Sequence, residues 1–280
     1  MKTTKNIFIA LISIFILAGC TQKEKHDLII LYPNWAEGIA MTHLADVILN
    51  EKGYSASLKR IEPGPMYAAL SKGDADVYMD AWLPHTHKDY WERFGDKLEI
   101  IGSVFDNGIT GLVVPSYVEI NSIEELNANK DKFGGQIYGI AAGAGIHSNT
   151  EKAIKEYNLD YTQISSSETS MLTALRKAES QKEWIVITGW KPHFMWFKHD
   201  LKALEDPLSI YPTDRISIIS RLGFKEEKPE LAEFFKNFVL SEDLLGELIN
   251  DVESQKEAKD GARIFYDKHK EMLDTWLKSK

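Results

Sequence analysis

The chain has 280 residues, with 33 Lys and Arg residues against 42 Asp and Glu residues and a formal net charge of −9 at pH 7. This acidic balance argues against nucleic acid as a partner, because binding to a phosphate backbone requires basic patches. The length is sufficient for two lobes of ordinary domain size.

The N-terminus has the pattern of a secretory signal. Lys2 and Lys5 precede an apolar run at 7–18, which is shorter than the roughly 20 residues that a membrane span needs. The run ends in Leu-Ala-Gly before Cys20, the only cysteine of the chain, and this arrangement resembles the bacterial lipobox. We therefore predict a lipoprotein signal peptide at 1–19, lipidation of Cys20 and a short tether at 20–26. The alternative is an uncleaved N-terminal anchor. With a lipid at Cys20, the chain is expected at the extracytoplasmic face of the cell membrane, or in a periplasm, without crossing the membrane.

Beyond the tether, short apolar strands alternate with amphipathic helices. Strands are predicted at 28–32, 56–61, 77–81, 136–140, 184–188 and 216–221. Helices are predicted at 36–52, 65–72, 169–178, 229–239, 241–253 and 258–269, and a further helix is predicted with Ser148 as its cap. This alternation favours an α/β fold with mainly parallel sheets flanked by helices.

The usual signatures of enzymes and metal sites are missing from the sequence. It contains no phosphate-binding glycine loop, no His-Glu-x-x-His and no Gly-x-Ser-x-Gly. His85 and His87 could face the same way on an extended segment, but no further ligand has a suitable spacing. We therefore expect no metal, no cofactor and no catalytic residue.

Tryptophan in loop positions is the most informative feature. Trp35, Trp82 and Trp190 each follow a predicted strand, and ligands of open α/β sheets bind at that edge. Core packing explains the other four tryptophans well enough. Indole has the strongest cation-attracting face among aromatic side chains, at roughly 0.5–2 kcal/mol per contact. Three such rings predict a cage for a trimethylammonium group.

A betaine also carries a carboxylate, which needs hydrogen-bond donors. The segment 142–146 runs from a predicted strand into a helix, whose first backbone N–H groups form an anion site. His87 could add a side-chain donor. An ordinary tight loop and a surface histidine are the alternative interpretations of these two features.

Several motifs in this order closely resemble the glycine betaine/proline betaine substrate-binding proteins of bacterial ABC importers. They are Asn34-Trp35-Ala36-Glu37, Glu62-Pro63-Gly64-Pro65-Met66, Ala81-Trp82-Leu83-Pro84-x-Thr86-His87-Lys88 and Thr188-Gly189-Trp190-x-Pro192-His193. The resemblance implies that Trp35, Trp82 and Trp190 form an aromatic cage and that His87 with the amides of Gly145 and Ile146 binds the carboxylate. Three positions depart from the family's pattern and leave the preferred betaine open: Tyr67, His85 and Phe194.

The resulting prediction is a type II periplasmic-binding-protein-like fold with its ligand cleft between two lobes. Lobe I would comprise 27–113 and 212–280, and lobe II would comprise 114–211. The expected function is capture of glycine betaine or a similar quaternary-ammonium solute for osmoprotection, with delivery to ABC importer permease subunits. Alternatives are a choline or carnitine binder, a binder of dimethylsulfonium analogues, a protein-binding surface lipoprotein, and an enzyme acting on such compounds through Asp80 or Glu37.

Overall fold

The computed structural model describes residues 26–278. The predicted signal peptide, Cys20 and nearly all of the predicted tether lie outside the described residues. Within the described range, no helix is both long enough and apolar enough to span a bilayer.

The strands form one nine-stranded sheet in the order β2-β1-β3-β9-β4-β7-β5-β6, with β8 paired to β4. Their bounds are β1 (Leu28–Tyr32), β2 (Ala56–Arg60), β3 (Val77–Leu83), β4 (Leu98–Pro115), β5 (Gln136–Gly139), β6 (Thr162–Ser165), β7 (Ile187–Lys191), β8 (Leu201–Ala203) and β9 (Asp214–Arg221). The predicted α/β fold is confirmed. The sheet is mixed, because β1 and β5 have parallel neighbours whereas β4 and β9 run antiparallel to theirs.

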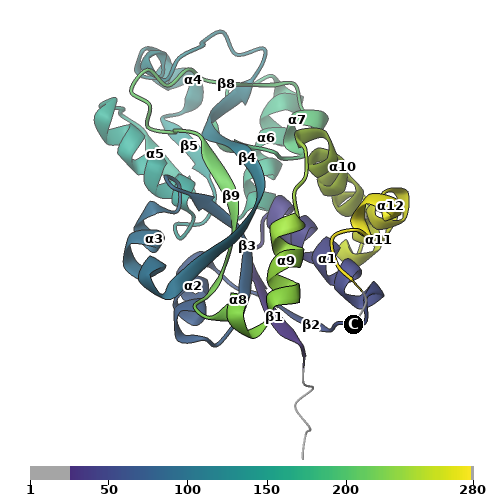
Figure 1. The fold of residues 1–280 in the computed structure, drawn as a ribbon. Coiled ribbons are helices and arrows are strands. Elements are labelled where there is room, and N and C mark those ends of the chain that lie inside the picture. Colours follow the sequence, from purple (N-terminus) through teal and green to yellow (C-terminus); the bar gives the residue numbers. More distant parts are fainter. Residues whose placement is uncertain (1–25, 279–280) are drawn as a thin grey trace, which may run out of the picture.

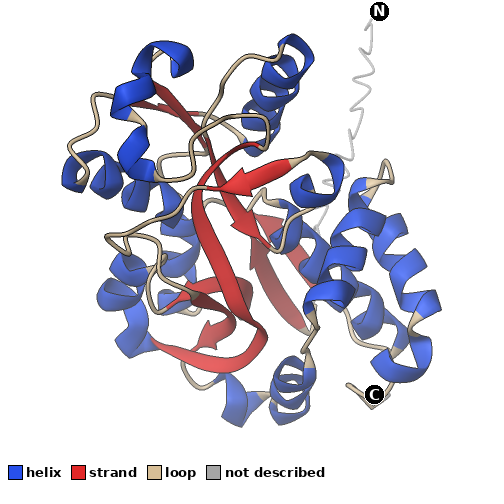
Figure 2. Cartoon of the chain, turned by 90° about the horizontal axis from the view of Figure 1, so that it is seen from above, coloured by secondary structure: helices blue, strands red, loops and turns tan. Residues whose placement is uncertain are grey.

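Helices flank the sheet on both sides (Figure 2). They are α1 (Ala36–Glu51), α2 (Pro63–Lys72), α3 (Lys88–Phe94), α4 (Lys130–Phe133), α5 (Gly145–Glu156), α6 (Glu168–Gln181), α7 (Met195–Lys198), α8 (Phe224–Glu227), α9 (Pro229–Asn237), α10 (Glu242–Glu253), α11 (Ala258–Lys268) and α12 (Lys270–Leu273). All seven residues of β3 are buried, as expected for a strand covered on both faces.

The long strand β4 connects the two halves of the molecule (Figure 1). Its first part pairs with β9 as far as Gly108, and its second part pairs with β7 from Ile109 onward. The chain returns to the first half at Asp214, where β9 begins. We propose that the lobes are those expected from the sequence, with the change of partner in β4 close to the proposed boundary at 113.

Three local predictions need correction. The helix expected to be capped by Ser148 begins at Gly145 with Ala144 at its N-cap, because the loop after β5 is shorter than predicted. The strand expected at 184–188 is β7, at Ile187–Lys191. Trp82 and Trp190 therefore lie within β3 and β7 and not in loops after them, whereas Trp35 follows β1 as predicted.

Candidate functional site

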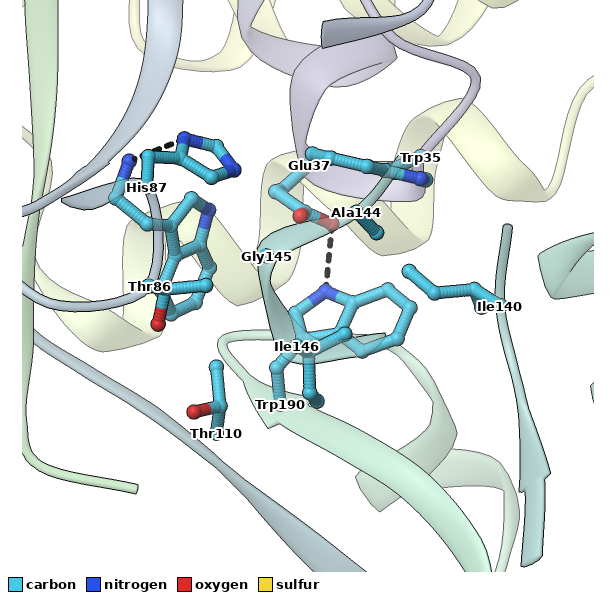
Figure 3. Close-up of a pocket in the computed structure, with 11 residues that line it drawn as sticks. Trp35, Glu37, Thr86, His87, Thr110, Ile140, Ala144, Gly145, Ile146 and Trp190 are labelled. Carbon is cyan, nitrogen blue, oxygen red and sulfur yellow. Dashed lines mark hydrogen bonds between the residues drawn. The ribbon is translucent and has the colours of Figure 1, made fainter. Parts of the chain in front are cut away.

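All six residues predicted to bind ligand line one small pocket between the proposed lobes. The lining residues come from the start of α1, from β3 and the loop after it, from β4, from the loop between β5 and α5, from the start of α5 and from β7 (Figure 3). They are Trp35, Glu37, Trp82, Thr86, His87, Thr110, Ile140, Ala144, Gly145, Ile146 and Trp190.

Two of the three tryptophans are held at the indole N–H by a buried carboxylate. Trp82 Nε1 donates to Asp80 Oδ1 at 2.8 Å, and Trp190 Nε1 donates to Glu37 Oε2 at 2.8 Å. Asp80 and Trp82 are two residues apart on one strand, so their side chains point to the same face. The bond from Trp190 to Glu37 joins the two proposed lobes, as Figure 3 shows. Each bond fixes the plane of its ring, so the indoles of Trp82 and Trp190 are held in place by the protein.

The two carboxyl groups are almost fully buried, at 1% exposure each. Burial raises the pKa of Glu37 well above its ordinary value, and the nearby charges of Asp80 and Glu168 raise it further. Burial likewise raises the pKa of Asp80, with a smaller contribution from Glu168, while the bond from Trp82 lowers it. Asp80 Oδ2 has no hydrogen-bond partner among the described residues. A cation in the pocket would compensate these groups, because opposite charge favours the ionised carboxylate.

His87 presents a neutral donor to the pocket. Its Nδ1 accepts the backbone N–H of Trp82 at 3.1 Å and lies 3.4 Å from the Tyr67 hydroxyl, which assigns the ring proton to Nε2. Burial lowers the pKa of His87 to about 3. The imidazole therefore stays uncharged at neutral pH with its Nε2–H available. His85 is exposed whereas His87 is buried, so the two do not face the same way.

The first turn of α5 brings backbone donors to the pocket. Gly145 is the first residue of the helix, and its N-cap, Ala144, makes no side-chain bond. The first N–H groups of a helix have no intrahelical acceptor and carry a partial positive charge. A Cβ at Gly145 would lie 2.6 Å from the carbonyl carbon of Thr86, so only glycine allows α5 to approach the loop after β3 this closely.

That loop is fixed by a single carboxylate. Asp214, at the start of β9, accepts the backbone N–H of His85 at 2.6 Å and of Thr86 at 2.9 Å. The peptide bonds Leu83–Pro84 and Lys191–Pro192, which follow two of the tryptophans, are cis. Asp214 thereby sets the path of the chain between Trp82 and His87.

Five of the lining residues were not predicted from the sequence as ligand contacts: Glu37, Thr86, Thr110, Ile140 and Ala144. The hydroxyls of Thr86 and Thr110 are buried and have no partner among the described residues. Glu37 could have been found from its position two residues after Trp35. Thr110 carries no such signal, because β4 itself was not predicted. Over the same described range, no cluster of three or more His, Cys, Asp or Glu side chains is placed to hold a metal.

Comparisons with known proteins agree on one family. The family described as the substrate binding domain of ABC-type glycine betaine transport system matches residues 26–268. The chain is 37% identical over 144 residues to the glycine betaine/carnitine transport binding protein GbuC of Listeria monocytogenes, a segment that is 50% of this chain and spans about half (48%) of that relative.

Two solved structures are similar over almost their whole length. Lactococcal OpuAC, in its closed-liganded conformation with glycine betaine, has a TM-score of 0.85 and 31% identity, covering 90% of this chain and 99% of that chain. The glycine betaine, L-proline-binding protein ProX of Borrelia burgdorferi has a TM-score of 0.85 and 33% identity, covering 89% and 96%. These structures share the two-lobed fold described above.

Proposed function

This chain belongs to the family of substrate-binding domains of ABC-type glycine betaine transport systems, and from that membership we propose that it captures glycine betaine or a close analogue for an ABC importer. The observation that carries the proposal is the pocket itself. It combines aromatic walls and the buried carboxylate of Glu37 with neutral hydrogen-bond donors. A betaine presents the complementary pair, a methylated cation and a carboxylate.

The cationic end would lie among Trp35, Trp82 and Trp190. A trimethylammonium group has no N–H to donate and is weakly hydrated, so ring faces and methyl burial can replace its water at little cost. Cation–π contacts contribute roughly 0.5–2 kcal/mol each, and more when the site is desolvated. The carboxylates of Glu37 and Asp80, bonded to two of the rings, add negative charge behind the cage walls.

The carboxylate end would lie against α5 and His87. The amides of Gly145 and Ile146 offer donors at a helix N-terminus, and His87 Nε2–H offers a third donor without bringing a charge. These roles remain proposals for this chain. They are supported by the position of all six groups around one small pocket.

Isothermal calorimetry with glycine betaine, proline betaine, carnitine and choline tests the proposal. We expect saturable one-to-one binding of a betaine and much weaker binding of choline, which lacks the carboxylate. Binding of choline alone would support the aromatic cage but contradict the proposed carboxylate subsite. Absence of binding to all four ligands would contradict the proposed function.

Carnitine is the second candidate ligand, because it keeps both the trimethylammonium and the carboxylate, and the name of GbuC includes it. Its longer chain must fit the same small pocket, which favours the shorter betaines. An enzyme acting on these compounds receives less support, since the relatives reported above are transport binding proteins. Turnover of betaine or choline by the purified protein would favour the enzyme over the transport binding protein.

We also propose that the chain is secreted, lipidated at Cys20 and held at the outer face of the cell membrane near its permease. The support is the sequence pattern of 1–20 alone. Metabolic labelling with a fatty acid should mark the wild-type protein, and Cys20→Ser should abolish the label and release the protein from the membrane fraction. Equal labelling of both proteins would place the lipid elsewhere.

A further inference from the structure

The carboxylate of Glu168 connects the two proposed lobes at a point outside the pocket. Glu168 is the first residue of α6 in lobe II, and its side chain is 10% exposed. Its Oε2 accepts the backbone N–H of Ala36, the first residue of α1 in lobe I, at 3.1 Å. Its Oε1 lies 3.0 Å from His193 Nε2. Glu168 is absent from the pocket lining, so its side chain would not contact a ligand in the pocket.

Helix α1 lacks a cap of its own. Its N-cap residue is Trp35, which makes no side-chain bond to the helix. Helices are usually capped by a local Ser, Thr, Asp or Asn, and an uncapped first turn is less stable. Here the cap comes from Glu168, 132 residues away in sequence. Separation of the lobes would therefore leave the first N–H of α1 without this acceptor.

The position of Glu168 is fixed by His193. The Nδ1 atom of His193 accepts the backbone N–H of Met195 at 2.9 Å, so the ring proton lies on Nε2 and is donated to Glu168. The same imidazole meets Trp190 edge-on, with ring centroids 4.8 Å apart and an interplanar angle of 80°.

These contacts are linked to one another around the start of α1. Trp190 donates to Glu37, Glu168 accepts from Ala36, and His193 contacts both Trp190 and Glu168. The three lobe II residues Glu168, His193 and Trp190 therefore hold the start of α1. Two consecutive residues of lobe I are thus held by lobe II, one at its backbone and one at its side chain.

We propose that Glu168 is a positioning residue that stabilises the closed arrangement of the lobes and slows ligand release without touching the ligand. This inference rests on the proposed function. The bond from Ala36 to Glu168 exists only while the lobes meet, so it lowers the free energy of the closed state alone. Its loss should shift the closing equilibrium by about tenfold, the usual size for one buried bond to a charged group. Since the substitution removes no residue of the pocket lining, the effect should appear in the dissociation rate and not in the association rate.

The test compares Glu168→Ala and Glu168→Gln with Glu156→Gln, an exposed glutamate of α5 in the same lobe. Amide hydrogen exchange in the first turn of α1 is measured with and without glycine betaine, and betaine dissociation is followed by tryptophan fluorescence in stopped flow. We expect Glu168→Ala to speed exchange at this turn and to raise the dissociation rate about tenfold. Glu168→Gln keeps one oxygen acceptor and should give a smaller effect.

The melting temperature serves as the control for folding, and it should change little in Glu168→Gln. Exchange and dissociation rates in Glu168→Ala equal to those of the Glu156→Gln control would overturn the proposal. An association rate that falls while dissociation stays constant would also overturn it. If the wild-type protein binds no betaine, the proposed function fails, and the exchange measured without ligand still decides whether Glu168 holds α1.

Discussion

At the scale of single residues, the third wall of the proposed cage contacts both proposed lobes. Trp190 lies on β7 of lobe II, while the acceptor of its indole N–H is Glu37 on α1 of lobe I. The ring is 4% exposed, so the bond is shielded from water. Trp190 therefore lines the pocket and also joins the proposed lobes, whereas the indole N–H of Trp82 is bonded to Asp80 on its own strand.

We expect Trp190→Ala to weaken betaine binding by more than tenfold. The variant loses one cation–π wall and leaves Glu37 buried without its donor. Calorimetry gives the change in Kd. Trp184→Ala is the control, because Trp184 is half-buried and lies outside the pocket; it should leave Kd within about twofold. An unchanged Kd for Trp190→Ala would show that Trp190 does not form part of the cage.

The variant His87→Asn tests the contact to the carboxylate of the ligand separately from the contacts to its cation. Asparagine can still accept the backbone N–H of Trp82 in place of Nδ1, but it is too short to replace the Nε2–H donor. Loss of a donor to a charged group costs roughly 1.5–3 kcal/mol, so glycine betaine should bind at least tenfold more weakly. Choline has no carboxylate, and its affinity should change little. Equal losses for both ligands would indicate that His87 supports the pocket and does not bind the carboxylate.

Binding should release protons. Burial raises the pKa of Glu37 and Asp80 in the unliganded protein, and a cation in the cage favours their ionised forms, which lowers both pKa values. Fewer protons are then bound in the complex, so affinity rises as the pH rises through the unliganded pKa values. His87, with a pKa of about 3, does not titrate between pH 5 and 8 and cannot reverse this sign.

Calorimetry of betaine binding in two buffers of different ionisation heat, from pH 5 to pH 8, measures the number of protons released. Glu37→Gln should reduce that number, since one of the two carboxyl groups is gone. Proton uptake on binding, or an affinity that rises as the pH falls, would show that these carboxyl groups do not face the cation.

At the scale of elements, the start of α5 determines whether the lobes can meet. Gly145→Ala places a Cβ against the backbone of Thr86 in the other lobe, where the flexible end of a side chain is not available to give way. We expect at least a hundredfold loss of betaine affinity, as measured by calorimetry. The melting temperature of the unliganded protein should hold or rise slightly, because alanine is the better helix former.

Gly143→Ala is the matched control, two residues earlier in the same segment. Its Cβ would lie 3.8 Å from the Tyr90 hydroxyl, an ordinary contact, so affinity should stay within about threefold. A similar loss in both variants would point to a general requirement for flexibility before α5. Full affinity in Gly145→Ala would show that α5 and the loop after β3 need not come this close.

The alternation of strands and helices was predictable because periodicity and caps are local signals. The Ser122–Glu125 side chains form a capping box, and Ser241 caps α10, both from sequence patterns of a few residues. Trp35, Trp82, His87 and Trp190 were found through motifs that resemble a known family. By contrast, β4 was missed because its 18 residues change partners midway and its pairing with β9 shifts register repeatedly, which breaks the two-residue alternation of a strand.

Long-range partners could not be predicted from such local signals. Glu168 meets Ala36 across 132 residues, and Asp214 meets Thr86 across 128. Neither acid lies in a motif, and each has a local interpretation, one as an acidic residue in the first turn of a helix and the other as the start of a strand. The path of the sheet, in which β9 lies between β3 and β4, brings Asp214 to the loop after β3.

At the scale of the whole molecule, the acidic chain and the proposed ligand differ in net charge. The formal charge of −9 should attract a cation from a distance, whereas a zwitterion has no net charge to be steered. Salt screens such attraction beyond a Debye length of about 10 Å at 0.1 M. Contacts inside the buried cage are screened much less. The binding of a net cation should therefore depend more strongly on ionic strength than the binding of a zwitterion.

We expect the association rate and the Kd of glycine betaine to change less than about twofold between 50 and 500 mM NaCl, because its binding depends on the enclosed site. Choline, a net cation, should associate more slowly and bind more weakly as salt increases. Stopped-flow tryptophan fluorescence measures both rates, and KCl in place of NaCl controls for ion-specific effects. A betaine affinity that falls steeply with salt would mean that the pocket is open to solvent in the complex, and it would contradict enclosure of the ligand between the lobes. Constant betaine affinity would fit the proposed osmoprotective role, since such a protein must retain its ligand at high ionic strength.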